Sequence, residues 1–175
     1  MSNKKKFLVF CYTGLGNLIL KIPLFANIKN LYPDAEIDII TGNRNNFQTD
    51  EDFFLKQQNL ISNIIKITED DNLLNAYKKL IKINKKKYNA IFLPFDGTPL
   101  RFKILMYFIR GKKIMHYIIL PKKIFSSYFK FLFFYLCLDM KLVKLKLDKH
   151  EVSSNLDLFK KYINANNLAL KEFVP

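Results

Sequence analysis

The stretch FLVFCYTGLGN, residues 7–17, decides the fold of this chain. Five apolar residues lead into a turn with two glycines, and an apolar run that carries Pro23 follows. A buried strand that feeds a glycine turn and then a helix is how an α/β sheet opens a ligand crevice. The glycines let a ligand approach the backbone closely, and the helix start offers unpaired N–H groups to an anion. The stretch therefore predicts a first strand over 7–11 with a binding site behind it.

Strand and helix patterns alternate along the rest of the chain, which favours a parallel sheet covered by helices. The expected strands are residues 37–40, 64–67, 88–93 and 114–119. The expected helices cover about 70–86, 100–109 and 125–138, and a last helix has one apolar stripe of Val152, Leu156, Phe159 and Ile163. Residues 141–149 read as a basic connector. We expect one α/β domain, spanning 1–175.

The helix over 70–86 has a further expected feature. Its buried face is predicted to consist of Leu73, Tyr77, Leu80 and Ile81. Its lysines are then a solvated outer surface.

The chain has 175 residues, half of them hydrophobic, and a formal charge of +14 from 29 Lys and Arg against 15 Asp and Glu. That length permits a sizeable core. The charge would attract a phosphate-bearing partner: a nucleic acid, an anionic membrane face or a phosphorylated glycolipid. A biased genomic base composition that enriches Lys, Asn and Ile explains the charge equally well.

The two cysteines, Cys11 and Cys137, suit a reducing cytoplasm, and neither has a partner at metal-ligand spacing. Glycines interrupt the apolar segment behind the N-terminal lysines, so we interpret it as a strand and not as a signal peptide. Residues 124–138 are apolar but shorter than the roughly 20 residues of a membrane span. A buried helix is the first interpretation there, and docking to a membrane surface the second.

The glycine turn matches neither of two common nucleotide motifs. A dinucleotide fingerprint needs a third glycine at position 19, where this chain has Ile19, and no Gly-Lys-Ser/Thr loop occurs. The absence of both motifs argues against a nicotinamide-binding or P-loop function.

Several separated features resemble one family in order. They are Gly16-Asn17, Pro23, Tyr32-Pro33-Asp34-Ala35 before the second strand, Lys87-Tyr88-Asn89-Ala90-Ile91, Gly97, Arg110-Gly111 and His150-Glu151-Val152. This series resembles glycosyltransferase family 9, the heptosyltransferase-like enzymes of lipopolysaccharide core synthesis. The resemblance covers nearly the whole chain but only the first half of a family member.

The resemblance implies a GT-B arrangement, in which two Rossmann-like domains face each other and this chain is the N-terminal, acceptor-side one. The C-terminal donor-binding domain is then absent from this sequence, and the chain alone is incomplete as an enzyme. The implied reaction transfers a heptose-like sugar, with inversion, from an ADP-linked nucleotide sugar to a lipopolysaccharide-core or related glycan. No cofactor and no metal are implied. We expect a cytoplasmic protein, with a glycolipid or glycan acceptor, a separate donor-domain chain and contact with the inner membrane face as its partners.

The implied catalytic position is Asn17, where the heptosyltransferases have an Asp proposed as general base. An amide cannot take up a proton usefully near pH 7, because a general base must be titratable. Asn17 as a helix cap is the competing interpretation. Asp96, after the fourth strand, is the best substitute carboxylate, although a turn-forming Asp before Gly97 explains it as well.

Acceptor binding is assigned to residues of the glycine turn and to basic residues later in the chain. They are Thr13, Gly14, Gly16, Arg101, Lys112, Lys113 and His150. Guanidinium and ammonium groups suit acceptor phosphates and carboxylates. The competing interpretations are a solvated surface for each lysine and a capping role for His150. His116 lies within an expected strand and is interpreted as structural.

Two other classes of function stay open. One is a non-catalytic basic module that holds an anionic glycolipid or a membrane surface, which the amide of Asn17 favours. The other is nucleic-acid binding, which rests only on charge and scattered aromatic residues, since no recognised RNA or DNA motif occurs.

Overall fold

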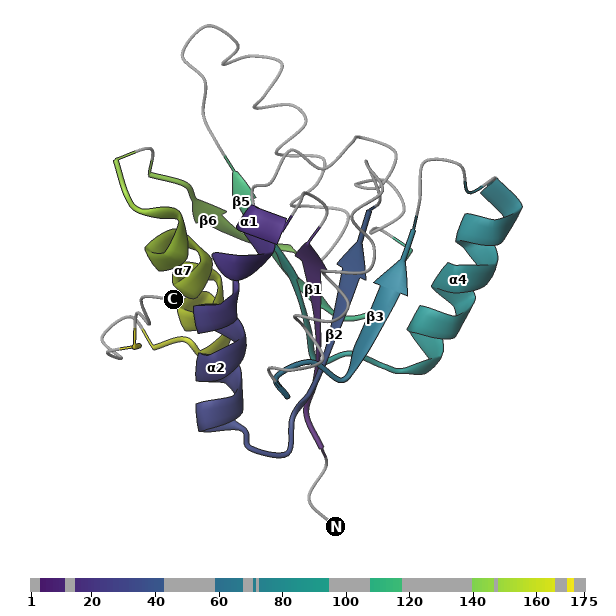
Figure 1. Cartoon of the computed structure of the whole chain (residues 1–175), viewed down its shortest axis with the longest axis horizontal. Helices are drawn as coiled ribbons and strands as arrows, with labels where there is room; N and C mark the ends of the chain where they lie inside the picture. The colour runs from purple at the N-terminus through teal and green to yellow at the C-terminus, as the bar shows by residue number, and fades with distance from the viewer. Residues whose placement is uncertain are drawn as a thin grey trace, which may run out of the picture.

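The computed structural model describes residues 4–11, 15–42, 59–67, 71, 73–94, 108–117, 140–146, 148–165 and 170–171. Both helices and strands form along them (Figure 1). The elements are β1 (Lys6–Cys11), α1 (Leu15–Ile19), α2 (Ile22–Leu31), β2 (Glu36–Thr41), β3 (Asn63–Lys66), α4 (Leu73–Lys85), β4 (Ala90–Leu93), β5 (Lys112–Tyr117), β6 (Met140–Lys144) and α7 (Glu151–Ile163). The expected helices over 100–109 and 125–138 fall largely or wholly outside the described residues.

The strands form one six-stranded sheet in the order β3-β2-β1-β4-β5-β6, with every pair parallel. Phe7 pairs with Ile37 of β2 on one side and with Ala90 of β4 on the other, so β1 is central. This is the strand order of a Rossmann fold. The expectation of a Rossmann-like α/β sheet is confirmed.

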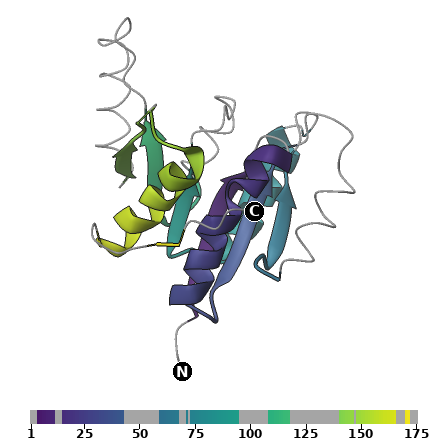
Figure 2. The ribbon, with the colours of Figure 1, turned by 60° about the vertical axis from the view of Figure 1, so that its left-hand side comes forward.

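Helices cover both faces of the sheet, which makes three layers (Figures 1 and 2). Successive side chains of β1 point to opposite faces. Phe7 and Val9 pack in one core with α2 and α7, and Leu8 and Phe10 pack in another with α4. Because all of these side chains are buried, β1 reads as an unbroken apolar run, as strands of parallel sheets do.

The helix behind the glycine turn is divided in two. Helix α1 ends at Ile19, and α2 begins at Ile22 with Pro23 in its first turn. A proline fits there because the first helical N–H groups have no partner within the helix. The sequence spacing predicts that Leu20, Leu24, Ile28 and Leu31 line one face of this helix. Leu24 and Ile28 are buried, whereas Leu20 is half-buried and Leu31 is exposed.

Two expectations from the sequence are wrong. Tyr77 and Ile81 of α4 are exposed, because Ala76, Leu80 and Ile83 form the side of the helix that packs on the sheet. The supposed basic connector contains the sixth strand, β6, at one edge of the sheet. Lysines are common on edge strands because they prevent pairing with other chains. In this segment they made the sequence look like a polar connector.

A buried carboxylate ties three segments together on the α4 side of the sheet. Asp38 of β2 accepts hydrogen bonds from Asn63 of β3 at 2.7 Å, and from Lys86 and Tyr88 at 2.6 Å each. Burial and the hydrogen bond to this carboxylate raise the pKa of Tyr88. The network is fully satisfied, so we interpret it as structural.

Candidate functional site

The order of the strands locates the candidate site. The chain leaves β1 to build β2 and β3 on one side and later returns to build β4, β5 and β6 on the other. Ligands of such sheets bind outside the carboxyl ends of the strands, where this order reverses. In this chain that place lies beyond Cys11 of β1 and Leu93 of β4. We call it the switch edge.

Gly16 and Asn17 lie at the switch edge, within α1 directly after β1. Gly16 is exposed, and a Cβ added to it would meet no atom within 4 Å. The open space leaves the backbone accessible to a ligand. Asn17 is half-buried and occupies the third position of α1, so its interpretation as a helix cap is wrong.

Lys21 contacts α1 from the interior of the molecule. The sequence did not predict this role. Its side chain is completely buried, and Nζ donates a hydrogen bond to the backbone carbonyl of Asn17 at 3.1 Å. A buried ammonium needs such partners, because leaving water is costly for a charge. The signal in the sequence was a lysine in an otherwise apolar run of residues 18–25.

Helix α7 is fastened to the same region. Asn155 donates from Nδ2 to the carbonyl of Leu20 at 3.2 Å, between α1 and α2. His116 of β5 donates from Nε2 to the carbonyl of Ser154 at 2.8 Å. His116 and Asn155 are both buried. These bonds join α7 to β5 and to the α1–α2 junction.

Burial governs the charge of His116. Loss of solvent lowers the pKa of this imidazole to about 4, and the charges of Lys21 and Lys149 act in the same direction. The hydrogen bond to Ser154 and the charge of Asp157 oppose the shift. At neutral pH the ring is therefore uncharged, in agreement with a structural role.

His150 follows β6 and begins α7, so it lies on the same side of the sheet as the switch edge. It is the N-cap residue, and its Nδ1 accepts a hydrogen bond from the N–H of Val152 at 3.3 Å. The side chain is exposed. The structure thus gives His150 a capping contact, and its assignment to acceptor binding stays a prediction.

The structure does not bring Lys112 and Lys113 to the switch edge. Both belong to the first residues of β5, paired with Ala90 and Ile91 at the start of β4. Strand β5 therefore begins before the expected Ile114, and these lysines lie toward the opposite edge of the sheet. Lys112 contacts the ring of Tyr162 in the last turn of α7, with Nζ 5.5 Å from the centroid. Lys113 is buried.

Four other predicted site residues lie outside the described residues: Thr13, Gly14, Asp96 and Arg101. Thr13 and Gly14 follow β1 in the sequence, and Asp96 and Arg101 follow β4, which are the two strands at the switch point. Their assignments stay predictions.

A metal is not excluded by sequence alone. Among the residues that the structure describes, no three His, Cys, Asp or Glu side chains gather as metal ligands. One Asp-x-Asp run, Asp50-Glu51-Asp52, lies outside them. The expectation of no metal therefore stays a prediction.

The described helices also include none with the length and apolar character that crossing a bilayer requires.

Comparison with known proteins gives matches of structure only. No family model and no curated protein matches the sequence. The structure of a glycosyl transferase family 9 protein from Veillonella parvula matches with a TM-score of 0.61, at 17% identity over 93% of this chain and 43% of that one. Escherichia coli heptosyltransferase WaaC, solved with ADP, matches with a TM-score of 0.63, at 12% identity over 96% of this chain and 49% of that one. The chain has the fold of the matched part of these two proteins.

A third match covers less of the molecule. The ADP-heptose heptosyltransferase II of Escherichia coli lipopolysaccharide synthesis has a TM-score of 0.50 at 14% identity, over 63% of this chain and 30% of that one. The chain thus spans less than half the length of each of the three. The likeness establishes the fold and leaves donor and acceptor to be proposed.

Proposed function

We propose that this chain forms the acceptor-side domain of a glycosyltransferase. The reaction transfers a heptose-like sugar from a nucleotide sugar to a lipopolysaccharide-core or related glycan. One observation supports this most: the chain shares the fold of the matched part of three glycosyltransferases, and Gly16 in α1 has open space beside it at the switch edge. Ligands of this class of sheet bind at that edge.

The acceptor lies against the backbone at Gly16 in this proposal. The side-chain amide of Asn17 orients the acceptor hydroxyl by hydrogen bonding, since an amide both donates and accepts. Lys21, behind the turn, fixes the main chain of Asn17 through its carbonyl. Thr13, Gly14 and Arg101 are assigned to the acceptor from their places after β1 and β4 in the sequence.

The nucleotide sugar is held by a second, donor-binding domain. WaaC was solved with ADP, and this chain covers 49% of that protein. We infer an ADP-linked sugar as the donor for the same reason. The second domain supplies most contacts to the nucleotide, whether it belongs to the same polypeptide or to a separate chain.

The test is acceptor binding at the switch edge. A lipopolysaccharide-core oligosaccharide freed of its acyl chains is titrated into ¹⁵N-labelled protein. We expect chemical-shift changes at Gly16 and Asn17, and loss of binding by tenfold or more in Gly16→Phe, because the ring fills the open space. Asp34→Phe, an exposed site at the opposite edge between α2 and β2, is the matched control and binds normally. Equal binding by wild type and Gly16→Phe contradicts the proposal.

A second function is favoured by one residue. Asn17 has no titratable group, so the domain would hold an anionic glycolipid without transferring a sugar to it. The two functions differ in turnover. Release of ADP from an ADP-sugar, dependent on the core acceptor and on a donor-binding domain, identifies the transferase, whereas acceptor binding without ADP release identifies the binding module.

A further inference from the structure

Three large apolar side chains of α4 face away from the sheet. Leu74, Tyr77 and Ile81 are 68%, 59% and 42% exposed. Their spacing of three and four residues places them on one stripe of the helix. Single exposed apolar residues are ordinary, but a stripe of three along one helix marks an interaction surface.

A row of lysines runs beside this stripe. Lys78, Lys82 and Lys85 follow one another at spacings of four and three, and all are exposed. In the part of the chain that the structure describes, none of the three has an ion pair, whereas Lys79 pairs with Asp71 and Lys86 with Asp38. Helix α4 contains no acidic residue. The outer side of α4 thus combines an apolar stripe with positive charge that no carboxylate among the described residues neutralises.

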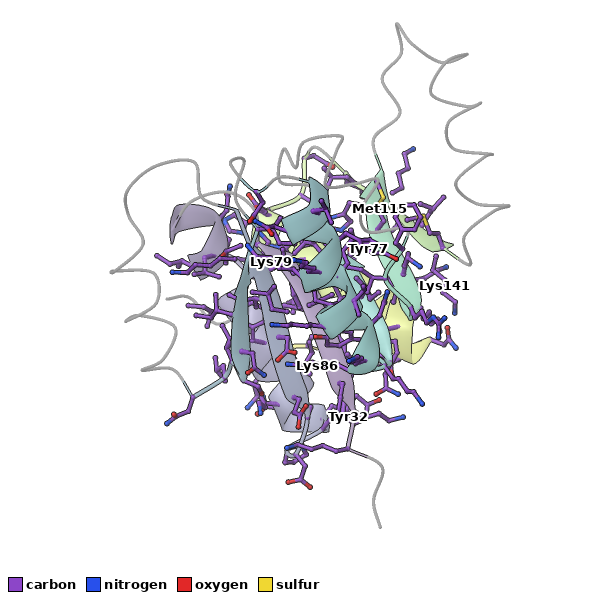
Figure 3. All side chains as sticks on the ribbon, turned by 90° about the vertical axis from the view of Figure 1, so that its right-hand side faces the viewer. Tyr32, Tyr77, Lys79, Lys86, Met115 and Lys141 are labelled. Carbon is purple, nitrogen blue, oxygen red and sulfur yellow. The ribbon has the colours of Figure 1, made fainter. Side chains whose placement is uncertain are left out.

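Figure 3 faces α4 and shows how the helix separates its side chains. Tyr77 and the paired Lys79 lie on opposite sides of the helix. Lys79 and Lys86 form ion pairs within the domain, with Asp71 and Asp38. The unpaired ones border the apolar stripe, and together with it they make up the α4 face: Leu74, Tyr77, Lys78, Ile81, Lys82 and Lys85.

We propose that the α4 face binds the surface of a lipid bilayer that contains anionic lipids. Helices that lie in a membrane interface combine aliphatic and aromatic residues, which enter the boundary between headgroups and acyl chains, with lysines. Lysine side chains extend along that boundary and place their ammonium groups at the lipid phosphates. A bilayer with anionic lipids therefore contacts both the apolar stripe and the lysines of the α4 face.

Charge complementarity selects this partner among the alternatives. The α4 face of a second copy would bring three further lysines and no carboxylate of α4, so the ammonium groups would repel one another. A single-stranded nucleic acid would use stacking rings, and the α4 face offers only Tyr77 for stacking. Leu74 and Ile81 have a favourable place in a bilayer and none on a nucleic acid.

Binding of a bilayer by the α4 face does not depend on the proposed transfer reaction. Helix α4 covers the side of the sheet opposite to α2 and α7. Its N-terminus follows β3, on the side of the switch edge. A bilayer on the α4 face therefore leaves that edge uncovered beside the membrane, within reach of the headgroups.

The test is co-sedimentation of the full chain with vesicles of phosphatidylcholine, with and without phosphatidylglycerol. We expect binding that depends on phosphatidylglycerol. The triple variant K78Q/K82Q/K85Q lowers the partition coefficient about a hundredfold, at roughly fivefold per lysine. The variant L74S/I81S lowers it as well, because the aliphatic contribution to insertion is lost.

A matched control separates the α4 face from the general charge of the chain. The variant K144Q/K146Q/K161Q removes the same charge from exposed lysines of β6, the loop behind it and α7. We expect it to bind vesicles within a few-fold of wild type. An equal loss in this control, or unchanged binding by L74S/I81S, overturns the proposal.

Sedimentation velocity without lipid tests whether a second copy of the chain binds the α4 face instead. If wild type self-associates, L74S/I81S is monomeric and vesicle binding is the same in both, the α4 face joins two copies and the bilayer proposal is wrong. Thermal unfolding of each variant checks the fold. The lysine triple still tests the proposal if the apolar double variant does not fold.

Discussion

Asn17 carries an amide where catalysis of the proposed reaction would use a carboxylate. Its backbone is fixed by the buried Lys21, so a side chain of the same shape should keep its place. We expect Asn17→Asp, assayed with an ADP-sugar, a core acceptor and a donor-binding domain, to transfer sugar about a hundredfold faster than wild type, because positioned general bases contribute roughly 10²–10⁴-fold. Release of ADP measures the rate.

Asp96→Asn is the comparison for that experiment. An unchanged rate in Asn17→Asp together with a large loss in Asp96→Asn would assign proton removal to Asp96 instead. Asn17→Ser, which is also untitratable, should not accelerate the reaction.

His116 makes stability depend on pH. Its pKa is about 4 in the folded protein and 6.5 as a free side chain, so the unfolded chain binds more protons between these values. The contribution to stability is complete above about pH 6.5. It is lost progressively as the pH falls toward 4, by an amount of the order of 3 kcal/mol. Urea unfolding at a series of pH values measures it.

His116→Gln supplies the control, because a glutamine amide still donates to the carbonyl of Ser154 but does not titrate in this range. We expect the variant to lose the steep dependence between pH 6.5 and 4. The charge on Glu36, whose pKa is lowered chiefly by its hydrogen bond with Lys4, remains in both proteins and adds a dependence at more acidic pH. A pH profile that is identical in wild type and variant would show that His116 is accessible to protons when folded.

At the scale of elements, the turn into β5 depends on Gly111. Its φ is +142°, and a Cβ would lie 2.8 Å from the carbonyl oxygen of Tyr88, just before β4. We expect Gly111→Ala to lower the free energy of unfolding by about 1–3 kcal/mol, as strained backbone positions do. Gly16→Ala is the matched control, since its Cβ meets no atom within 4 Å. Urea unfolding compares the two, and equal stabilities would show that the backbone at Gly111 adapts.

Elements with strong local patterns could be predicted from the sequence, and others could not. Strand β1 and helix α7 were predictable because their apolar residues are continuous or fall on one stripe. Strand β6 was missed because Lys141 and Lys144, with the lysines that follow them, made residues 141–149 read as a basic connector. The buried side of α4 was misplaced because Leu74, Tyr77 and Ile81 are as apolar as the residues that do pack on the sheet. Local hydrophobicity does not distinguish a core contact from an external surface.

For the molecule as a whole, the sequence predicted the class of fold but only part of the candidate site. The position of Gly16 and Asn17 behind β1 was predictable, since the glycines mark the end of that strand. Lys21 and Asn155 were not, because their roles come from contacts between segments that are distant in the sequence. Lys112 and Lys113 were predicted to be near the switch edge, but they lie at the opposite ends of the strands. The pairing of β5 with β4 decides where β5 begins, and the sequence does not show that pairing.

The central position of β1 has a consequence for how the chain is made. Lys6 at its start meets Asn89, which is 83 residues away in the sequence. Synthesis at about 5–20 residues per second leaves this flank of β1 without its partner for several seconds. During that time an apolar strand has an open hydrogen-bonding edge, which is the feature that templates aggregation. The nascent chain is therefore most vulnerable before β4 emerges, and a chaperone that covers β1 would act in that interval.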